Sequence, residues 1–175
     1  SSDRFSWNES NISTLNYEAL NNNACIILDN IKSIPSGPAD AFRKYVEQGG
    51  HLLLFPHSEA DLVSINSFLR MINADPIQEF QRKNNVALTK INDQASFWED
   101  VFEDIPENLS LPAINGRFLI TTRVRSSGET LLEFRDEKPF ISKVPFQNGA
   151  LFLVAAPLNE DFSAFPVHAL FVPFL

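Results

Sequence analysis

Residues 55–60, Phe-Pro-His-Ser-Glu-Ala, have the types and spacing that could do chemistry. They follow the apolar run 51–55 and precede an amphipathic stretch, a pattern typical of a turn between a strand and a helix. In many α/β enzymes this turn is a nucleophile elbow, which carries a serine between small residues because its backbone is strained and tightly packed. Ser58 could then be a nucleophile if a base removed its proton.

The residues around Ser58 argue against that chemistry. Its flanking positions hold Pro56 and Ala60 instead of glycines, and the proline stiffens the approach. His57 is adjacent in sequence, but neighbours on such a turn generally point apart, which leaves His168 as the distant base. Two interpretations stay open: Ser58 caps the following helix, or it is the nucleophile of a serine hydrolase with His168. The missing glycines favour the cap.

A second candidate lies at the end of the preceding strand. Asp29 and Asn30 close the run 24–31, where α/β folds bind ligands at the carboxyl edge of the sheet. The same residues could instead form an Asx turn with the next loop, which we favour. We predict no catalytic residue. A ligand site at this edge would be formed by Asp29, Asn30, His57, Ser58 and Glu59.

Metal and cofactor sites are not indicated. The three histidines have no metal-ligand spacing, and six glycines are too few for a phosphate-binding loop. Cys25, the single cysteine, lies within an apolar strand and is expected to be a small buried hydrophobe. We therefore predict no metal and no cofactor.

Four elements should position the turn. The continuous apolar run 24–31 and the run 51–55 predict buried strands, each followed by a helix, at 36–48 and 58–73. Ser36 is a possible cap for the first helix, and Gly49 is suited to the left-handed position that ends it. A strand–helix–strand–helix order predicts a parallel sheet.

The rest of the chain is richer in strands. We expect two short strands or extended segments within 76–91, around Asn84-Asn85. We also expect a helix at 94–105, strands at 117–125 and 129–134, and a terminal helix at the end. Asn148-Gly149 is a hairpin signal, and it leads into the apolar run 150–158, which should return to the buried sheet. No repeat or linker interrupts the chain, so we predict one domain over residues 1–175.

Composition limits the partners. The chain has 175 residues, 44% of them apolar, and a net charge of −8 without a cluster of basic residues, which argues against nucleic acid. It begins without methionine and ends in an apolar run, so we expect a piece of a longer, membrane-anchored protein. No run of 18 apolar residues occurs, and this piece should not itself span a bilayer.

The segment 24–69, with its strand ending in Asp29 and its stretch "YVEQGGHLLLFP", resembles the class I glutamine amidotransferase-like domain of bacterial membrane proteins with an aerotolerance-regulator (BatA-type) region. The final residues, 155–175, resemble that family's end segment. The resemblance implies an α/β, flavodoxin-like three-layer sandwich with a mostly parallel central sheet, here with a β-hairpin-rich insertion. It also implies a membrane-anchored parent whose domain lies outside the cytoplasm, in the periplasm.

The resemblance brings no catalytic triad, because active amidotransferases have cysteine at the elbow and a later His-x-Glu. Here His168 is followed by Ala169 and Leu170. We therefore expect a non-catalytic, amidotransferase-like domain that binds a protein in the cell envelope or a small ligand. One alternative is a serine hydrolase using Ser58 with His168. Another is a purely structural spacer, which predicts no concave pocket at the carboxyl edge of the sheet around Asp29 and His57.

Overall fold

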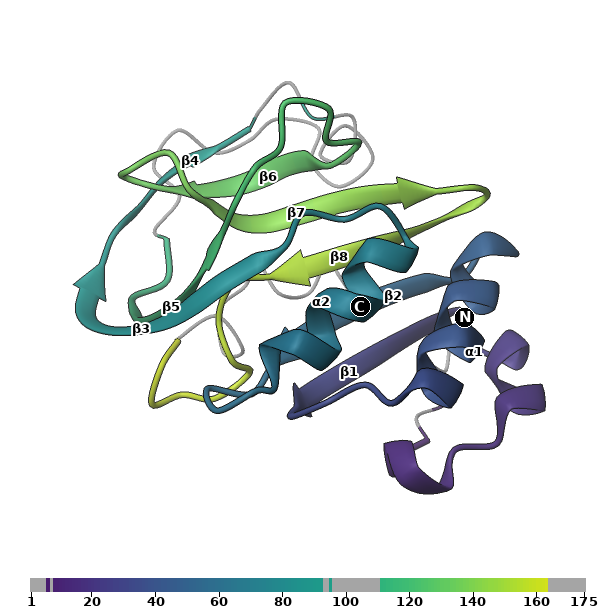
Figure 1. Cartoon of the computed structure of the whole chain (residues 1–175). Helices are drawn as coiled ribbons and strands as arrows, with labels where there is room; N and C mark the ends of the chain where they lie inside the picture. The colour runs from purple at the N-terminus through teal and green to yellow at the C-terminus, as the bar shows by residue number, and fades with distance from the viewer. Residues whose placement is uncertain (1–5, 7, 93–94, 96–110, 164–175) are drawn as a thin grey trace, which may run out of the picture.

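The computed structural model describes residues 6, 8–92, 95 and 111–163. The helices expected at 94–105 and at the C-terminus, and His168 with them, lie outside these residues. The described elements form two sheets, with two α-helices and two short 3-10 helices (Figure 1). In chain order they are η1 (Ile12–Thr14), η2 (Tyr17–Asn22), β1 (Cys25–Ile31), α1 (Ser36–Glu47), β2 (His51–Pro56), α2 (Leu62–Met71), β3 (Ile77–Val86), β4 (Leu88–Ile91), β5 (Ile114–Ile120), β6 (Glu129–Phe134), β7 (Pro139–Phe146) and β8 (Gly149–Val154).

The larger sheet has six strands in the order β1-β2-β8-β7-β6-β4. β1 runs parallel to β2, and β2 runs parallel to β8, so the predicted strand–helix–strand unit is confirmed. The predicted return of the run after Asn148 to the buried sheet is also confirmed, because β8 pairs with β2 at the centre. Gly49 has φ of 109°, the left-handed conformation expected after the first helix. Ser36 does not cap that helix, whose first flanking residue is Pro35.

The expectation of a flavodoxin-like sandwich with a mostly parallel sheet is wrong. Only two of the five strand pairings in the larger sheet are parallel, and β8, β7, β6 and β4 pair antiparallel. The hairpins that we expected as an insertion are instead half of the central sheet. Apolar periodicity identified these strands correctly, but it does not reveal which strand lies beside which, and that choice determines the fold class.

A second sheet contains only β3 and β5, paired antiparallel. Two strands are present at 76–91, but β3 continues through Asn84-Asn85 to Val86, so the expected break there is wrong. The two strands belong to different sheets. β5 also contacts the segment that follows β8. The backbone N–H of Phe118 donates to the carbonyl of Ala155 at 2.8 Å. The small sheet is therefore joined to the end of the central strand β8.

An ion pair between a buried arginine and an exposed aspartate also holds the small sheet. Arg117 of β5 is 4% exposed, and both of its terminal nitrogens donate to the carboxylate of Asp136, at 2.9 and 2.6 Å. Its guanidinium lies 4.8 Å from the ring centre of Phe134. Asp136 belongs to the turn between β6 and β7, so this contact connects the two sheets.

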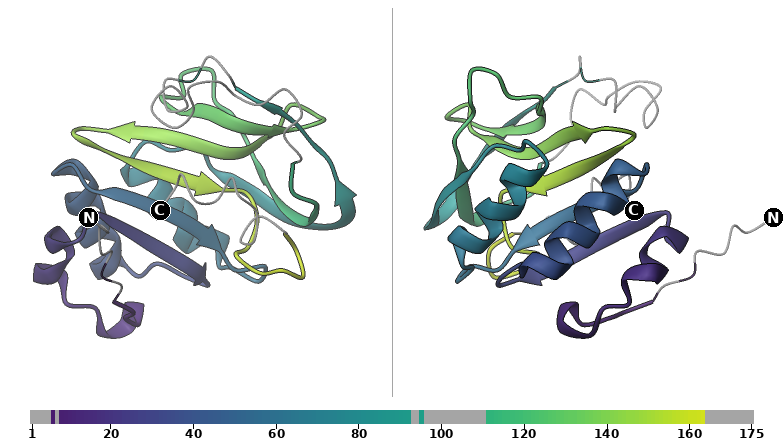
Figure 2. Two further views of the ribbon diagram at one scale, coloured as in Figure 1. Left: turned by 180° about the vertical axis from the view of Figure 1, so that it is seen from behind. Right: turned by 45° about the vertical axis from the view of Figure 1, so that its right-hand side comes forward.

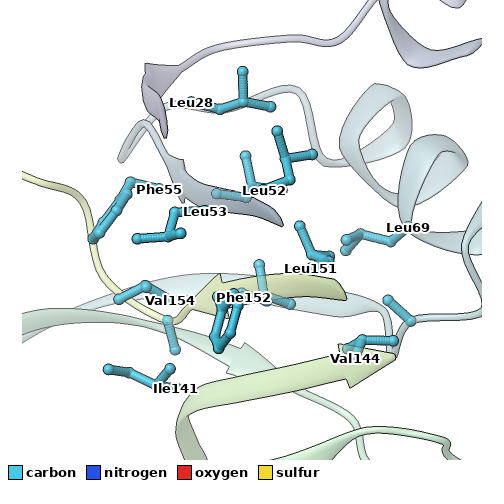
Figure 3. Packing of buried hydrophobic residues seen from close by; sticks show 14 of the residues in the cluster. Leu28, Leu52, Leu53, Phe55, Leu69, Ile141, Val144, Leu151, Phe152 and Val154 are labelled. Carbon is cyan, nitrogen blue, oxygen red and sulfur yellow. The ribbon is translucent and has the colours of Figure 1, made fainter. Parts of the chain in front are cut away.

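The core occupies both faces of the central strands. Every residue of β8 is buried, and β2 is buried from Leu52 onward. Figure 3 shows Leu52 and Leu151 on the same side as Leu69 of α2, while Phe55 and Phe152 point to the other side. Such two-sided burial is typical of central strands in a sheet that is covered on both faces.

The segment before β1 lies beyond the edge of the sheet. η1 and η2 sit on the side of β1 away from β2 (Figure 2), and Ile12 and Leu15 pack against the core. The hydroxyl of Tyr45 on α1 donates to the carbonyl of Asn23 at 3.0 Å. Burial raises the pKa of this hydroxyl to about 12, so it stays protonated as a donor. Within the described residues, 3-10 turns and not another strand lie on this side of β1.

The β7–β8 hairpin was predicted, and its turn is formed by Gln147 and Asn148. Gln147 has φ of 51°, and Gly149 is already paired as the first residue of β8. Gly149 is needed for a different reason: a Cβ there would collide with the backbone carbonyl oxygens of Val46 and Gly50.

Replacing Gly149 with alanine should therefore destabilise the fold by about 1–3 kcal/mol, the usual cost of forcing extra atoms into a packed site. Gly128→Ala is the matched control, because the nearest atom to a Cβ there is the side-chain Oγ of Ser126 at 3.2 Å. Urea unfolding measures both variants. Equal losses of stability at the two positions would contradict the close approach of α1 to β8.

Asp136→Asn should lower the free energy of unfolding at neutral pH by about 1–3 kcal/mol, because it leaves a buried cation poorly paired. The hydrogen bond from Arg117 holds the pKa of Asp136 below its ordinary value. A depressed pKa stabilises the fold above the unfolded value of about 3.9, and the contribution is lost as pH falls through the folded value. Unfolding curves of the two proteins should therefore converge in acid; a constant gap would contradict this role.

Candidate functional site

The predicted turn lies at the carboxyl ends of β1 and β2, between β2 and α2. Ile31 of β1 pairs with Pro56 of β2, and the register shifts between Leu28 and Ile31. Asp29 and Asn30 occupy this irregular stretch and are exposed. Asn30 has φ of 53°, a left-handed conformation that asparagine tolerates better than most residues. Partial burial and then the carboxylate of Glu9 raise the pKa of Asp29.

The turn itself is closed by local hydrogen bonds. The backbone N–H of Glu59 donates to Nδ1 of His57 at 2.9 Å, and the N–H of Ala60 donates to the carbonyl of His57 at 2.9 Å. A ring nitrogen that accepts a hydrogen bond carries no proton, so the neutral ring of His57 carries its proton on Nε2. Within the described residues, no hydrogen bond or ion pair joins Asp29 or Asn30 to this turn.

These bonds use the groups that a serine nucleophile would need. In a nucleophile elbow, the N–H of the residue after the nucleophile helps to stabilise the oxyanion. For Ser58 that residue is Glu59, whose N–H is already donated to His57. His168, the base in the serine-hydrolase alternative, lies outside the described residues.

The loops after the first two strands are joined by hydrogen bonds in the same way. The N–H of His57 donates to Ile31 at 2.9 Å, and the N–H of Asp61 donates to Lys32 at 2.7 Å. The hydroxyl of Ser64 accepts from the N–H of Ile34 and donates to its carbonyl, both at 2.9 Å. Backbone groups at this edge therefore bind one another, which leaves few of them available for a ligand.

The helix after the turn begins later than predicted. We expected it over 58–73 with Ser58 as its cap, and it spans Leu62–Met71 with Asp61 as the cap. Oδ1 of Asp61 accepts from the N–H of Val63 at 3.1 Å and of Ser64 at 3.2 Å. Serine and aspartate are both good caps, so the sequence offered two starts. Residues 57–60 form a turn with its own hydrogen bonds, so the helix begins after them, with Asp61 as its cap.

The outer face of α2 is a feature that sequence reasoning missed. Val63 is 82% exposed and Met71 is 39% exposed, and the exposed Ser67 and Arg70 lie between them on the same face. Arg70 is the helix's single charged residue. The low charge of this helix is the sequence signal for that face.

The other helix shows the contrast. On α1, Arg43 pairs with Asp40 at 3.1 Å and with Glu47 at 2.7 Å, and Lys44 also pairs with Asp40 at 2.7 Å. Charged side chains at such spacing are typical of a helix face exposed to water. The outer face of α2 has no comparable pairs among the described residues, and it presents apolar side chains instead.

The hollows found in the described part of the chain lie away from the predicted turn. One hollow of about 330 Å³ lies between η2 and α1, beside Tyr17 and Lys44. Another of about 340 Å³ lies beside Leu88 and Leu111. Neither reaches the turn at 57–61. No group of three possible metal ligands occurs in the described ranges.

Comparisons with known proteins identify similar folds. No protein-family model matches the chain, and no curated protein matches it. A cytoplasmic protein of Salmonella typhimurium is 13% identical with a TM-score of 0.64, over 93% of this chain and 74% of that one. A second, from strain LT2, is 15% identical with a TM-score of 0.64, over 82% and 64%.

Two other structures are also similar. A putative ThuA-like protein of Bacteroides uniformis is 17% identical with a TM-score of 0.60, over 83% of this chain and 64% of that one. A β-galactosidase of Bacillus circulans is 16% identical with a TM-score of 0.56; the match covers 86% of this chain but only 22% of the galactosidase. At these identities the likeness concerns the fold alone.

The expectation that this domain lies outside the cytoplasm, in the periplasm, is corrected by these findings. The two Salmonella proteins are described as cytoplasmic, which does not fit a periplasmic placement. No helix in the described ranges combines the length and the apolar character needed to cross a bilayer.

Asp61→Ala should destabilise the protein by about 0.5–2 kcal/mol, because two N–H groups at the start of α2 lose their acceptor. Ser58→Ala should change stability by less than about 0.5 kcal/mol, as for an ordinary surface position. Asp61→Ser, which keeps a capping oxygen, should recover most of the loss. Thermal unfolding distinguishes the two residues, and a larger loss for Ser58→Ala would restore Ser58 as the cap.

Proposed function

We propose that this domain is a non-catalytic protein-binding module, which docks its partner through the turn at 57–61 and the outer face of α2. One observation carries the proposal: the N–H of Glu59 donates to Nδ1 of His57. This single bond occupies both the oxyanion donor and one nitrogen of the imidazole next to Ser58. The turn lies where a nucleophile elbow would lie, but its hydrogen bonds are made within the turn and are not available to a substrate.

The surroundings of the turn support docking of a protein. Glu59 is exposed, His57 and Ser58 are half-buried, and the exposed Val63 follows on the first turn of α2. Exposed apolar side chains with polar residues around them are typical of surfaces that meet another protein. Backbone groups of the loops after β1 and β2 already form hydrogen bonds with one another, which disfavours a small ligand held by backbone groups.

The proposal also agrees with the amidotransferase-like resemblance of the sequence. The turn follows the second strand of a parallel strand–helix–strand unit, where that family places its nucleophile. Here the position holds His57 and Ser58 in place of cysteine. We therefore propose that the domain is a relative of amidotransferase-like domains that retains the strand-to-helix turn after β2 but lacks the catalytic cysteine.

A fluorophosphonate probe, which labels activated serines, tests the proposal against the hydrolase alternative. We expect the 175-residue chain to show no labelling beyond that of Ser58→Ala, because the oxyanion donor of Ser58 is already occupied. A known serine hydrolase in the same reaction is the positive control. Labelling of the native chain that disappears in Ser58→Ala would establish an activated serine and overturn the non-catalytic proposal.

A further inference from the structure

The two ends of α2 carry opposite charge. At its N-terminal end lie the exposed carboxylates of Glu59 and Asp61, beside the apolar Val63. Near its C-terminal end, Arg70 is exposed beside Met71. Within the described residues, neither Glu59, Asp61 nor Arg70 belongs to an ion pair. The face is therefore acidic and apolar at one end, and basic and apolar at the other.

A fixed loop extends the basic end. Arg123 donates from Nε to Asp75 at 3.0 Å and from Nη2 to the carbonyls of Asn73 at 2.9 Å and Ala74 at 2.8 Å. The hydroxyl of Ser126 donates to Asp75 at 2.7 Å. These bonds fasten the loop between β5 and β6 to the chain just beyond α2.

That loop holds an apolar side chain out in solvent. Val124 is fully exposed, and Arg125 next to it is exposed as well. A partner that covered Val124 would remove its apolar side chain from water. The anchoring by Asp75 reduces the entropy that the loop would lose on that contact. The basic end of α2 therefore has a preformed apolar projection.

We propose that the partner docked on this face is a second copy of the chain, packed with α2 antiparallel to α2 around a twofold axis near Ser67. The inference rests on the proposed function and names its partner. In this arrangement Val63 of one copy meets Met71 of the other, because both lie four residues from Ser67. The small side chain of Ser67 lets the helices approach closely at the axis.

Charge favours this orientation over its reverse. An antiparallel pair places Arg70 and Arg125 of one copy toward Glu59 and Asp61 of the other, twice around the axis. A parallel pair would place like charges together, which disfavours it. The helix dipoles have the same preference. Because each chain has a net charge of −8, association needs such a local match of opposite charges.

The test is sedimentation of the full 175-residue chain from about 1 μM to about 500 μM, the range in which small, partly polar interfaces dissociate. We expect a monomer–dimer equilibrium that weakens as salt is added. Val63→Asp should abolish the dimer, because it places a charge in the apolar contact. Thermal unfolding of each variant shows whether the fold is intact.

A charge swap makes the test specific for the antiparallel pair. Arg70→Glu and Glu59→Lys should each weaken dimerisation by at least about fivefold, and the double variant should regain most of the affinity. Arg135→Glu is the matched control, because Arg135 is an exposed arginine in the turn between β6 and β7, and its substitution should leave the dimer unchanged.

A chain that is monomeric throughout this range, or a dimer that tolerates both Val63→Asp and Arg70→Glu, would overturn the inference. Failure of the double variant to recover would overturn the antiparallel orientation. A monomer without serine labelling would refute the dimer and leave the non-catalytic module standing. A dimer that is labelled at Ser58 would refute the non-catalytic function and leave the interface standing.

Discussion

The parallel pairing of β2 with β8 is the contact on which the rest of the structure depends. It joins residues 51–54 to residues 150–153, and all of these except His51 are buried. Bringing such distant segments together costs chain entropy, which the two-sided apolar burial of both strands offsets. The pairing also requires α1 to end against Gly149, where no side chain fits. Once β8 lies beside β2, the antiparallel strands follow along one side and β1 along the other.

Local features of the sequence predicted a good part of this arrangement. The runs 24–31 and 51–55, the first helix with Gly49 at its end, and the hairpin at Asn148 are all encoded in stretches shorter than twenty residues. What failed was long-range: β3 and β4 look alike as extended segments, yet they join different sheets. The sequence of either segment does not indicate which strand it pairs with, because strand pairing depends on how the whole core packs.

The candidate site shows the same division. The sequence placed Asp29, Asn30 and residues 57–59 at one edge of the sheet, and the structure puts them there. It did not predict that the N–H of Glu59 would donate to His57, nor that Asp61 would cap α2. Each polar group in a tight turn has several acceptors within reach. The backbone path, which packing determines, selects one of them.

The outer edge of β1 has a consequence for the protein's solubility. The strand Cys25–Ile31 contains four isoleucine or leucine residues and neither proline nor lysine, the residues that usually keep an open strand from recruiting another chain. The segment 8–22 lies on the outer side of this strand without forming a ladder of its own. The strand also ends in an irregular stretch with the exposed Asp29 and Asn30, and irregular pairing and a charged side chain both disfavour cross-β growth from such an edge.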